Sequence, residues 1–156
     1  MSEVHRLAAV GPLALAHQTK CAVQVEDFTF PPNSTFVSNL HFIMRDPSNF
    51  TNPEVFNPGR FIGEDGRWGI RFISRCSKYY LRYKRHPALV PFGVGKRQCM
   101  GEALARNEVM LFTVGLIQRL SFLPPASGET PDPERYHVSI TRIPTDFHVK
   151  FLNNKN

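Results

Sequence analysis

Apolar positions recur at helical spacing in two parts of the chain, and prolines separate these parts from the rest. A short first helix is expected over residues 2–10, because Gly11-Pro12 ends it. Residues 100–120 hold no proline, and Pro124-Pro125 follows them. Their helically spaced positions are Leu104, Leu111, Phe112, Gly115 and Leu116. The pattern therefore predicts one short helix at the start and one long helix in the second half.

Elsewhere the alternation is typical of β-strands. Residues 21–25 and 35–37 flank a Pro31-Pro32-Asn33 turn, which predicts a hairpin. In the tail, residues 138–141 and 147–151 alternate on either side of a proline and predict a second hairpin. The fold class expected from these segments is α+β.

Residues 44–63 have too many prolines and glycines for a long helix. An irregular meander is expected there, with three aromatic side chains as its buried anchors: Phe50, Phe56 and Phe61.

The charge of the chain is unevenly distributed. Its 156 residues, about one domain in size, carry 19 Lys and Arg against 13 Asp and Glu, a formal charge of +6. Nine basic residues and no acidic ones lie between Arg67 and Arg97, so the remainder holds 10 basic and 13 acidic residues, a net −3. The basic character therefore belongs to one stretch.

Composition excludes several classes of protein. A hydrophobic content of 42% with 13 Phe argues against disorder. No apolar run approaches the roughly 18 residues that span a bilayer, and the N-terminus lacks the pattern of a signal peptide. Three widely spaced cysteines (Cys21, Cys76 and Cys99) indicate neither a disulfide framework nor a zinc or redox pair, which favours a reducing compartment.

Candidate chemistry concentrates in residues 91–101, here called the Cys loop. Its glycines allow the backbone to approach another group closely, and Cys99 stands just before the predicted long helix. The positive end of that helix and nearby Arg97 favour the thiolate. Such a thiolate is a nucleophile or a metal ligand, and no base that a nucleophile needs is identifiable nearby. An axial haem ligand needs only the thiolate, backbone N–H groups and a cation for the propionates.

Two other interpretations of the Cys loop compete with a haem ligand. A phosphate-binding loop needs glycine at position 90 and serine or threonine at position 97, where the chain has Val90 and Arg97. A buried structural cysteine is the common alternative for any single Cys.

The Cys loop matches the pattern F-x-x-G-x-R-x-C-x-G, and this string resembles the haem-binding signature of the cytochrome P450 family. The resemblance implies that Cys99 is the axial thiolate on the iron of haem b. It also implies that Phe92 packs near the ligand and that Arg97 pairs with a haem propionate. The loop residues that it assigns to the cofactor are Phe92, Gly93, Gly95, Arg97, Cys99 and Gly101.

Other segments resemble the same family. Glu3 and Arg6 fit its E-x-x-R pair, and residues at this spacing share a helix face. Arg60 looks like the third member of the family's Glu–Arg–Arg triad, although Gly59 stands where the family often has an acid. The resemblance implies that this triad supports the Cys loop and has no catalytic role. A solvated surface ion pair is the alternative.

The resemblance also implies contacts with cofactor and substrate outside the loop. His17 stands where microsomal, drug- and steroid-metabolising members place a residue that contacts the second propionate. The alternative is an ordinary polar residue at the start of a strand. The possible substrate-lining residues are Leu13, Leu15 and Ile143. Their apolar character would equally suit a core turn.

The resemblance places residues 1–156 as the C-terminal part of a P450 catalytic domain, that is, an α+β fragment of a mainly α fold. Expected in order are the E-x-x-R helix, small hairpins, the meander, the Cys-ligand loop and the long helix. Residues 66–86 look like an insertion between the meander and the Cys loop. The membrane anchor and the long helix over the distal haem face are expected to be missing.

The leading functional hypothesis is a haem-thiolate monooxygenase, a metal-binding oxidoreductase. It would oxidise a hydrophobic small molecule with O₂ and electrons from an NADPH-dependent flavoprotein reductase, at the endoplasmic reticulum membrane. The alternative is a non-catalytic truncated product that binds haem weakly or not at all, with the cytosol as the location of the chain on its own. A nucleic-acid binder would rest only on the basic and aromatic residues 67–85 and is the least favoured.

Overall fold

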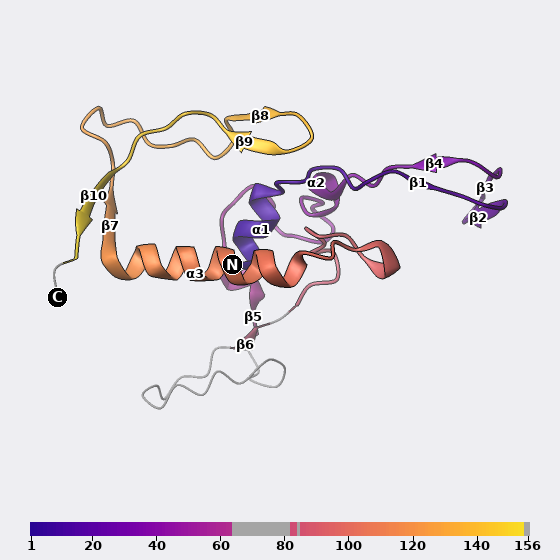
Figure 1. Ribbon diagram of the computed structural model, residues 1–156, viewed down its shortest axis with the longest axis horizontal. Coiled ribbons are helices and arrows are strands. Elements are labelled where there is room, and N and C mark those ends of the chain that lie inside the picture. Colours follow the sequence, from indigo (N-terminus) through magenta and orange to yellow (C-terminus); the bar gives the residue numbers. More distant parts are fainter. Residues whose placement is uncertain (64–81, 84, 155–156) are drawn as a thin grey trace.

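The computed structural model describes residues 1–63, 82–83 and 85–154, and most of the expected insertion at 66–86 lies outside them. The described part is elongated (Figure 1). One end carries a narrow β-hairpin, and the long helix α3 (Glu102–Arg119) runs toward the other end. Helices and two-stranded sheets alternate along the chain, so the α+β content agrees with the expectation from the sequence.

The expected first helix is α1 (Ser2–Ala8), which ends two residues earlier than the pattern predicts. Its end is set at Ala9, which takes a left-handed conformation (φ 37°) and donates its N–H to the carbonyl of His5. A left-handed residue after the last turn is a common helix terminator because it satisfies a carbonyl that has no partner within the helix. The side chains that α1 buries are charged, Glu3 and Arg6.

Both strands of the first predicted hairpin are present, but the predicted pairing between them is wrong. Strand β2 (Val23–Val25) pairs with β3 (Phe28–Phe30), and β1 (His17–Gln18) pairs with β4 (Thr35–Phe36). The strand at 21–25 therefore does not pair with 35–37. A tight turn at Glu26-Asp27, with Glu26 at φ 50°, provides β2 with a nearer partner than the residues beyond the Pro31-Pro32-Asn33 turn.

The meander contains short regular pieces. They are α2 (Leu40–Ile43), the 3₁₀ helix η1 (Pro58–Phe61) and β5 (Ile62–Gly63), which pairs with β6 (Arg82–Tyr83). Two of the expected anchors, Phe50 and Phe61, are buried, but Phe56 is mostly exposed and anchors nothing. Phe56 precedes Asn57, whose N–H and side chain are engaged with Glu3 and Gly59, and this leaves the Phe56 ring facing outward.

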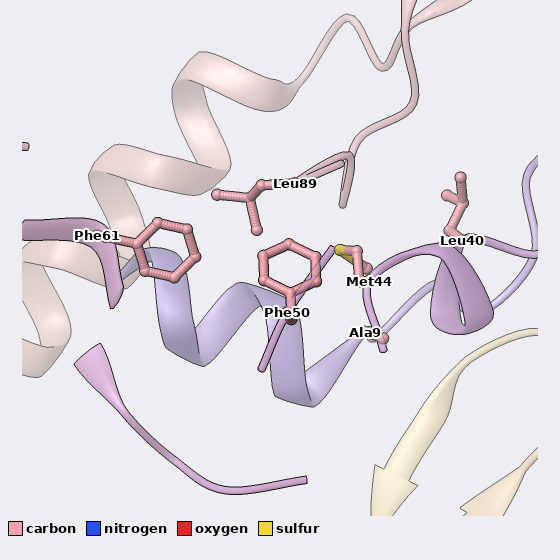
Figure 2. Packing of buried hydrophobic residues seen from close by; sticks show 6 residues of the cluster. All are labelled: Ala9, Leu40, Met44, Phe50, Phe61 and Leu89. Atoms are coloured by element: carbon pink, nitrogen blue, oxygen red, sulfur yellow. The ribbon is translucent and has the colours of Figure 1, made fainter. Parts of the chain in front are cut away.

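The hydrophobic core of the described residues is small and lies beside α1 (Figure 2). Phe50, Phe61 and Leu89 gather on one side of it, and Met44 lies toward Ala9 and α2. The full cluster consists of Ala9, Leu40, Met44, Phe50, Phe61 and Leu89. It therefore joins the first helix, the meander and the residues that enter the Cys loop.

Helix α3 corresponds to the long helix expected over 100–120. It buries none of its side chains within the described part of the chain. Among the described residues, no helix combines the length and the apolar character needed to cross a bilayer.

The tail strands differ from the expectation in place and in partner, because residues 139–141 form a turn and residues 147–149 lie outside any strand. Strand β8 (Tyr136–Val138) pairs with β9 (Arg142–Pro144), whereas β10 (Lys150–Asn153) pairs with β7 (Leu120–Leu123), directly after α3. The two tail strands therefore do not form one hairpin. A turn closed by the N–H of Ser139 on the carbonyl of Thr141 brings β9 back against β8 first.

Candidate functional site

The Cys loop is a chain of tight turns ahead of α3. Gly93 and Gly95 have φ of 76° and 75°, a conformation that side-chain-bearing residues rarely adopt. A short 3₁₀ helix, η2 (Gly95–Arg97), follows, and the N–H of Cys99 then donates to the carbonyl of Phe92 at 2.9 Å. The glycines allow the backbone to reverse so that the cysteine returns beside the start of the loop.

The thiol of Cys99 lies at the surface of the described structure. Cys99 is a free cysteine and is exposed among the described residues. It lies just outside α3, since Gly101 caps that helix and Glu102 begins it. A side-chain carbon added at Gly101 would lie 3.7 Å from the Cys99 sulfur, so the glycine leaves space beside it.

Arg97 is exposed at the end of η2, and no hydrogen bond or ion pair joins it to another described residue. The exposed residues nearest in sequence to Cys99 include the apolar Val94 and Met100. The described part of the chain holds no group of three or more His, Cys, Asp and Glu side chains arranged around a metal position. The loop therefore offers one thiol, one cation and apolar surface.

Phe92 joins the Cys loop to both helices. The His5 ring of α1 contacts it edge-on at a centroid distance of 5.3 Å, and the Arg106 guanidinium of α3 lies 5.2 Å from its centroid. Arg106 is oriented by a hydrogen bond of its Nε to Glu102 Oε1, at 2.7 Å. Burial and the neighbouring charge of Arg106 lower the pKa of His5. The His5 ring that packs against Phe92 is thus favoured in its neutral form.

The side chains of Glu3, Arg6 and Arg60, here called the triad, meet in a buried site next to the core. Arg6 donates from Nε to Glu3 Oε2 at 2.8 Å and from Nη2 to Oε1 at 2.9 Å. Arg60 Nε donates to Glu3 Oε1 at 3.2 Å. Glu3 and Arg6 are almost completely buried, so the surface ion-pair alternative is wrong.

The triad connects α1 to the meander. Arg6 Nη1 donates to the carbonyl of Met44, and Arg60 donates to the carbonyls of Thr51, Asn52 and Val55. Burial alone would raise the pKa of Glu3, but hydrogen bonds from Arg6, the Asn57 N–H and Arg60 outweigh it and lower that pKa. The carboxylate is therefore held in its charged form.

The structure does not bring His17 to the Cys loop. His17 is exposed on β1 opposite Phe36, and no hydrogen bond, ion pair or ring contact within the described residues links it to residues 91–101. Leu13, Leu15 and Ile143 are exposed among the described residues and do not belong to the core cluster there. Their two segments do meet, because the N–H of Arg142 donates to the carbonyl of Val10 at 2.8 Å.

Sequence reasoning missed the supporting residues of the site. His5 lies within the E-x-x-R pattern but was given no role, although its place between Glu3 and Arg6 puts it on the next face of α1. Arg106 follows Glu102 at four residues, the spacing of a helical ion pair, and this signal could have been read. Nothing in the sequence distinguishes Arg142, whose contacts all come from residues distant along the chain or from the facing strand.

Comparison with known proteins decides the family. The family model for Cytochrome P450 matches residues 1–151, nearly the whole chain. The chain belongs to the cytochrome P450 family. It is therefore a piece of a P450 domain with mixed helix and strand content.

Curated P450 relatives match over most of the chain. It is 33% identical over 150 residues to Cytochrome P450 2A13 of Homo sapiens, covering 96% of this chain and 27% of that protein. It is 36% identical over 132 residues to the Steroid 17-alpha-hydroxylase/17,20 lyase of Squalus acanthias, covering 85% and 23%. With Cytochrome P450 2C40 of Mus musculus the identity is 29% over 150 residues, covering 96% and 28%. The chain thus spans about a quarter of the length of these relatives.

The residues at the Cys loop fit the haem that this family membership implies. A flat apolar macrocycle that carries an iron and carboxylate side chains requires an accessible cysteine sulfur, apolar surface and a cation. Exposed Cys99 provides the first, Val94 and Met100 the second, and Arg97 the third. Gly101 keeps the space beside the sulfur open.

Proposed function

We propose that this chain provides the cysteine side of a haem-thiolate monooxygenase, an oxidoreductase that binds haem b. The observation that carries the proposal is the exposed Cys99 thiol at the end of a glycine-turned loop in a member of the P450 family. When bound, a thiolate-ligated haem supplies the chemistry of O₂ activation and insertion of one oxygen atom into an apolar substrate.

The chain's own residues divide the work of binding and orientation. Cys99 would ligate the haem iron, and the Phe92 carbonyl fixes the Cys99 backbone by accepting a hydrogen bond from its N–H. Arg97 would pair with one haem propionate, and the resemblance alone assigns His17 to the other, since no contact in the described structure joins His17 to the Cys loop. Phe92 holds the loop against α1 and α3 through its contacts with His5 and Arg106. The triad holds α1 and the meander together.

The remaining assignments follow from the resemblance. Residues 1–156 correspond to the C-terminal part of a P450 catalytic domain, with 66–86 as an insertion relative to the family. The substrate is a hydrophobic small molecule that Leu13, Leu15 and Ile143 contact, and O₂ is the co-substrate. An NADPH-dependent flavoprotein reductase supplies the electrons, and the endoplasmic reticulum membrane is the location.

The test is the spectrum of the haem-reconstituted chain after reduction and exposure to CO. A thiolate-ligated haem gives a strongly red-shifted Soret band under these conditions. We expect the band in the wild type and its loss in Cys99→Ser, because a serine hydroxyl is not a thiolate donor. Cys21→Ser is the matched control, since Cys21 is also a free, exposed cysteine and should leave the band unchanged.

Absence of the band from soluble, haem-reconstituted wild-type chain would contradict the proposal. The same holds if Cys99→Ser and Cys21→Ser weaken the band equally, because the ligand would then not be assigned to the Cys loop. Arg97→Gln is a further variant of the loop. It should keep the red-shifted band but lower the haem affinity, since one charged hydrogen bond to a propionate is lost.

A further inference from the structure

A second group of buried and half-buried polar side chains lies at the C-terminal end of α1. Its centre is Arg142, the first residue of β9, which is only 6% exposed. A buried arginine is rare unless its donors are engaged, so its partners indicate what it is there to do.

Arg142 reaches three other segments of the chain. Its Nη1 donates to the carbonyls of Leu7 (3.2 Å) and Ala8 (3.3 Å), the last residues of α1. The same nitrogen lies 2.8 Å from Nδ1 of His41 on α2. The guanidinium carbon lies 3.6 Å from the ring centroid of Tyr136 on the neighbouring strand β8. These contacts place a positive charge on the negative end of the α1 dipole.

A main-chain hydrogen bond also joins Arg142 to the end of α1. The N–H of Arg142 donates to the carbonyl of Val10 at 2.8 Å, just after α1 ends. Arg45 adds a second link, because its Nη2 donates both to the Leu7 carbonyl and to Glu134 ahead of β8, each at 3.2 Å. Arg45 also forms an ion pair with Glu54 of the meander. The β8–β9 hairpin (Figure 1) is thus attached to α1 directly through Arg142 and indirectly through Glu134, which pairs with Arg45.

His41 can accept the hydrogen bond from Arg142 only through an unprotonated Nδ1. The charged groups that face it are Arg142 from β9, Arg45 after α2, Glu54 of the meander and Glu134 ahead of β8. Burial and the two arginines lower the pKa of His41, and the two acids oppose this more weakly. Protonation would turn the acceptor into a donor beside two cations.

We propose that Arg142 is a positioning residue that fixes the β8–β9 hairpin on the end of α1, with neutral His41 as its acceptor. Arg142 directly precedes Ile143, and its backbone partner Val10 leads into Leu13 and Leu15. The contact therefore sets the relative place of the two segments assigned to substrate, and in that respect the inference rests on the proposed function. It also makes the attachment of the hairpin sensitive to mild acid.

The test is hydrogen exchange of the haem-reconstituted chain in a nonionic detergent, read at residue 142 and in β8. Arg142→Met keeps the side-chain volume and the amide but removes the guanidinium. We expect roughly tenfold faster exchange at these amides or more, because charge-assisted hydrogen bonds are lost. Arg142→Lys should give an intermediate rate, since it keeps the charge without the planar fork. Arg135→Met is the matched control, as the Arg135 side chain is 79% exposed.

The dependence on pH separates a positioning contact from general stability. After correction for intrinsic exchange, wild-type protection at residue 142 should be complete above pH about 6.5 and decline as pH falls through the lowered pKa of His41. His41→Asn places an uncharged acceptor near the Nδ1 position, so its protection should stay level over this range. β2 and β3 should show no such dependence in either protein.

The inference is overturned if Arg142→Met and Arg135→Met exchange alike at residue 142, or if this amide is unprotected in the wild type. A decline with acid that persists in His41→Asn would overturn the part assigned to His41. The CO spectrum of the same samples keeps the two proposals apart. A missing thiolate band with intact protection contradicts the proposed function and supports the contact, and the reverse result contradicts only the contact.

Discussion

At the scale of single residues, Glu3 shows how a buried acid can stabilise this structure. Its carboxylate accepts four hydrogen bonds, two from Arg6, one from Arg60 and one from the Asn57 N–H. A buried charge that is fully paired is tolerated, whereas removing one partner leaves the others buried and uncompensated. Glu3 is the member of the triad that both arginines share.

We predict that Glu3→Gln destabilises the chain by about 3 kcal/mol at neutral pH, because Arg6 would keep a buried charge without its counter-ion. The pKa of Glu3 is lowered on folding, so its contribution is present above its unfolded pKa of about 4.3 and is lost as pH falls through the folded pKa. Urea unfolding at neutral and acid pH should therefore show a smaller loss of stability with acid in Glu3→Gln.

Glu129→Gln is the control for this prediction, since Glu129 is exposed and no hydrogen bond or ion pair within the described structure engages its side chain. It should unfold as the wild type does at both pH values. Equal midpoints for Glu3→Gln and Glu129→Gln would show that the triad does not stabilise the chain in solution.

The triad could be predicted from the sequence, but other contacts of single residues could not. Glu3 and Arg6 are three residues apart on one helix, so their pairing is a local property that the E-x-x-R pattern reveals. Arg142 contacts residues more than a hundred positions away, and its burial depends on how β9 meets α1. Such contacts arise from tertiary packing, which periodicity does not encode.

At the scale of elements, the sequence identified strands better than it identified their partners. Alternation shows that residues 23–25 or 150–151 are extended, but pairing depends on which turn closes first. The turn at Glu26-Asp27 contains neither glycine nor asparagine, the usual signals of a tight hairpin. The expected pairing across Pro31-Pro32-Asn33 was wrong for this reason.

The Cys loop is an element whose conformation depends on glycine. We predict that Gly95→Ala destabilises the loop by about 1 kcal/mol, because an L-residue at φ 75° is strained even though space is available around the added carbon. Thermal unfolding and the intensity of the thiolate–CO band measure the effect together. Both should decrease.

Gly11→Ala is the matched control, because an added carbon there also meets nothing within 4 Å and no left-handed φ is required. Its effect should stay within about 0.5 kcal/mol of the wild type or be slightly stabilising. If Gly95→Ala behaves like Gly11→Ala, the positive φ of the loop is not maintained in solution.

At the scale of the whole molecule, apolar surface outweighs apolar core. The buried cluster has six members, whereas α3 buries none of its side chains within the described structure. On one side, Phe112 and Leu116 of α3 together with Phe151 of β10 line a groove of about 430 Å³. An exposed apolar area of this kind drives association unless another surface covers it.

We predict that the 156-residue chain self-associates without detergent and binds the dye 1-anilinonaphthalene-8-sulfonate strongly, through α3 and its groove. Phe112 is 70% exposed there, so Phe112→Lys should reduce both association and dye binding without loss of helix content. Asn107→Lys adds the same charge at an exposed position of α3 but removes no apolar surface, and it should reduce both less. Light scattering and dye fluorescence measure the two effects. A monomeric wild type that unfolds cooperatively and does not increase the fluorescence of the dye would contradict the prediction. The apolar residues of α3 would then be covered in solution.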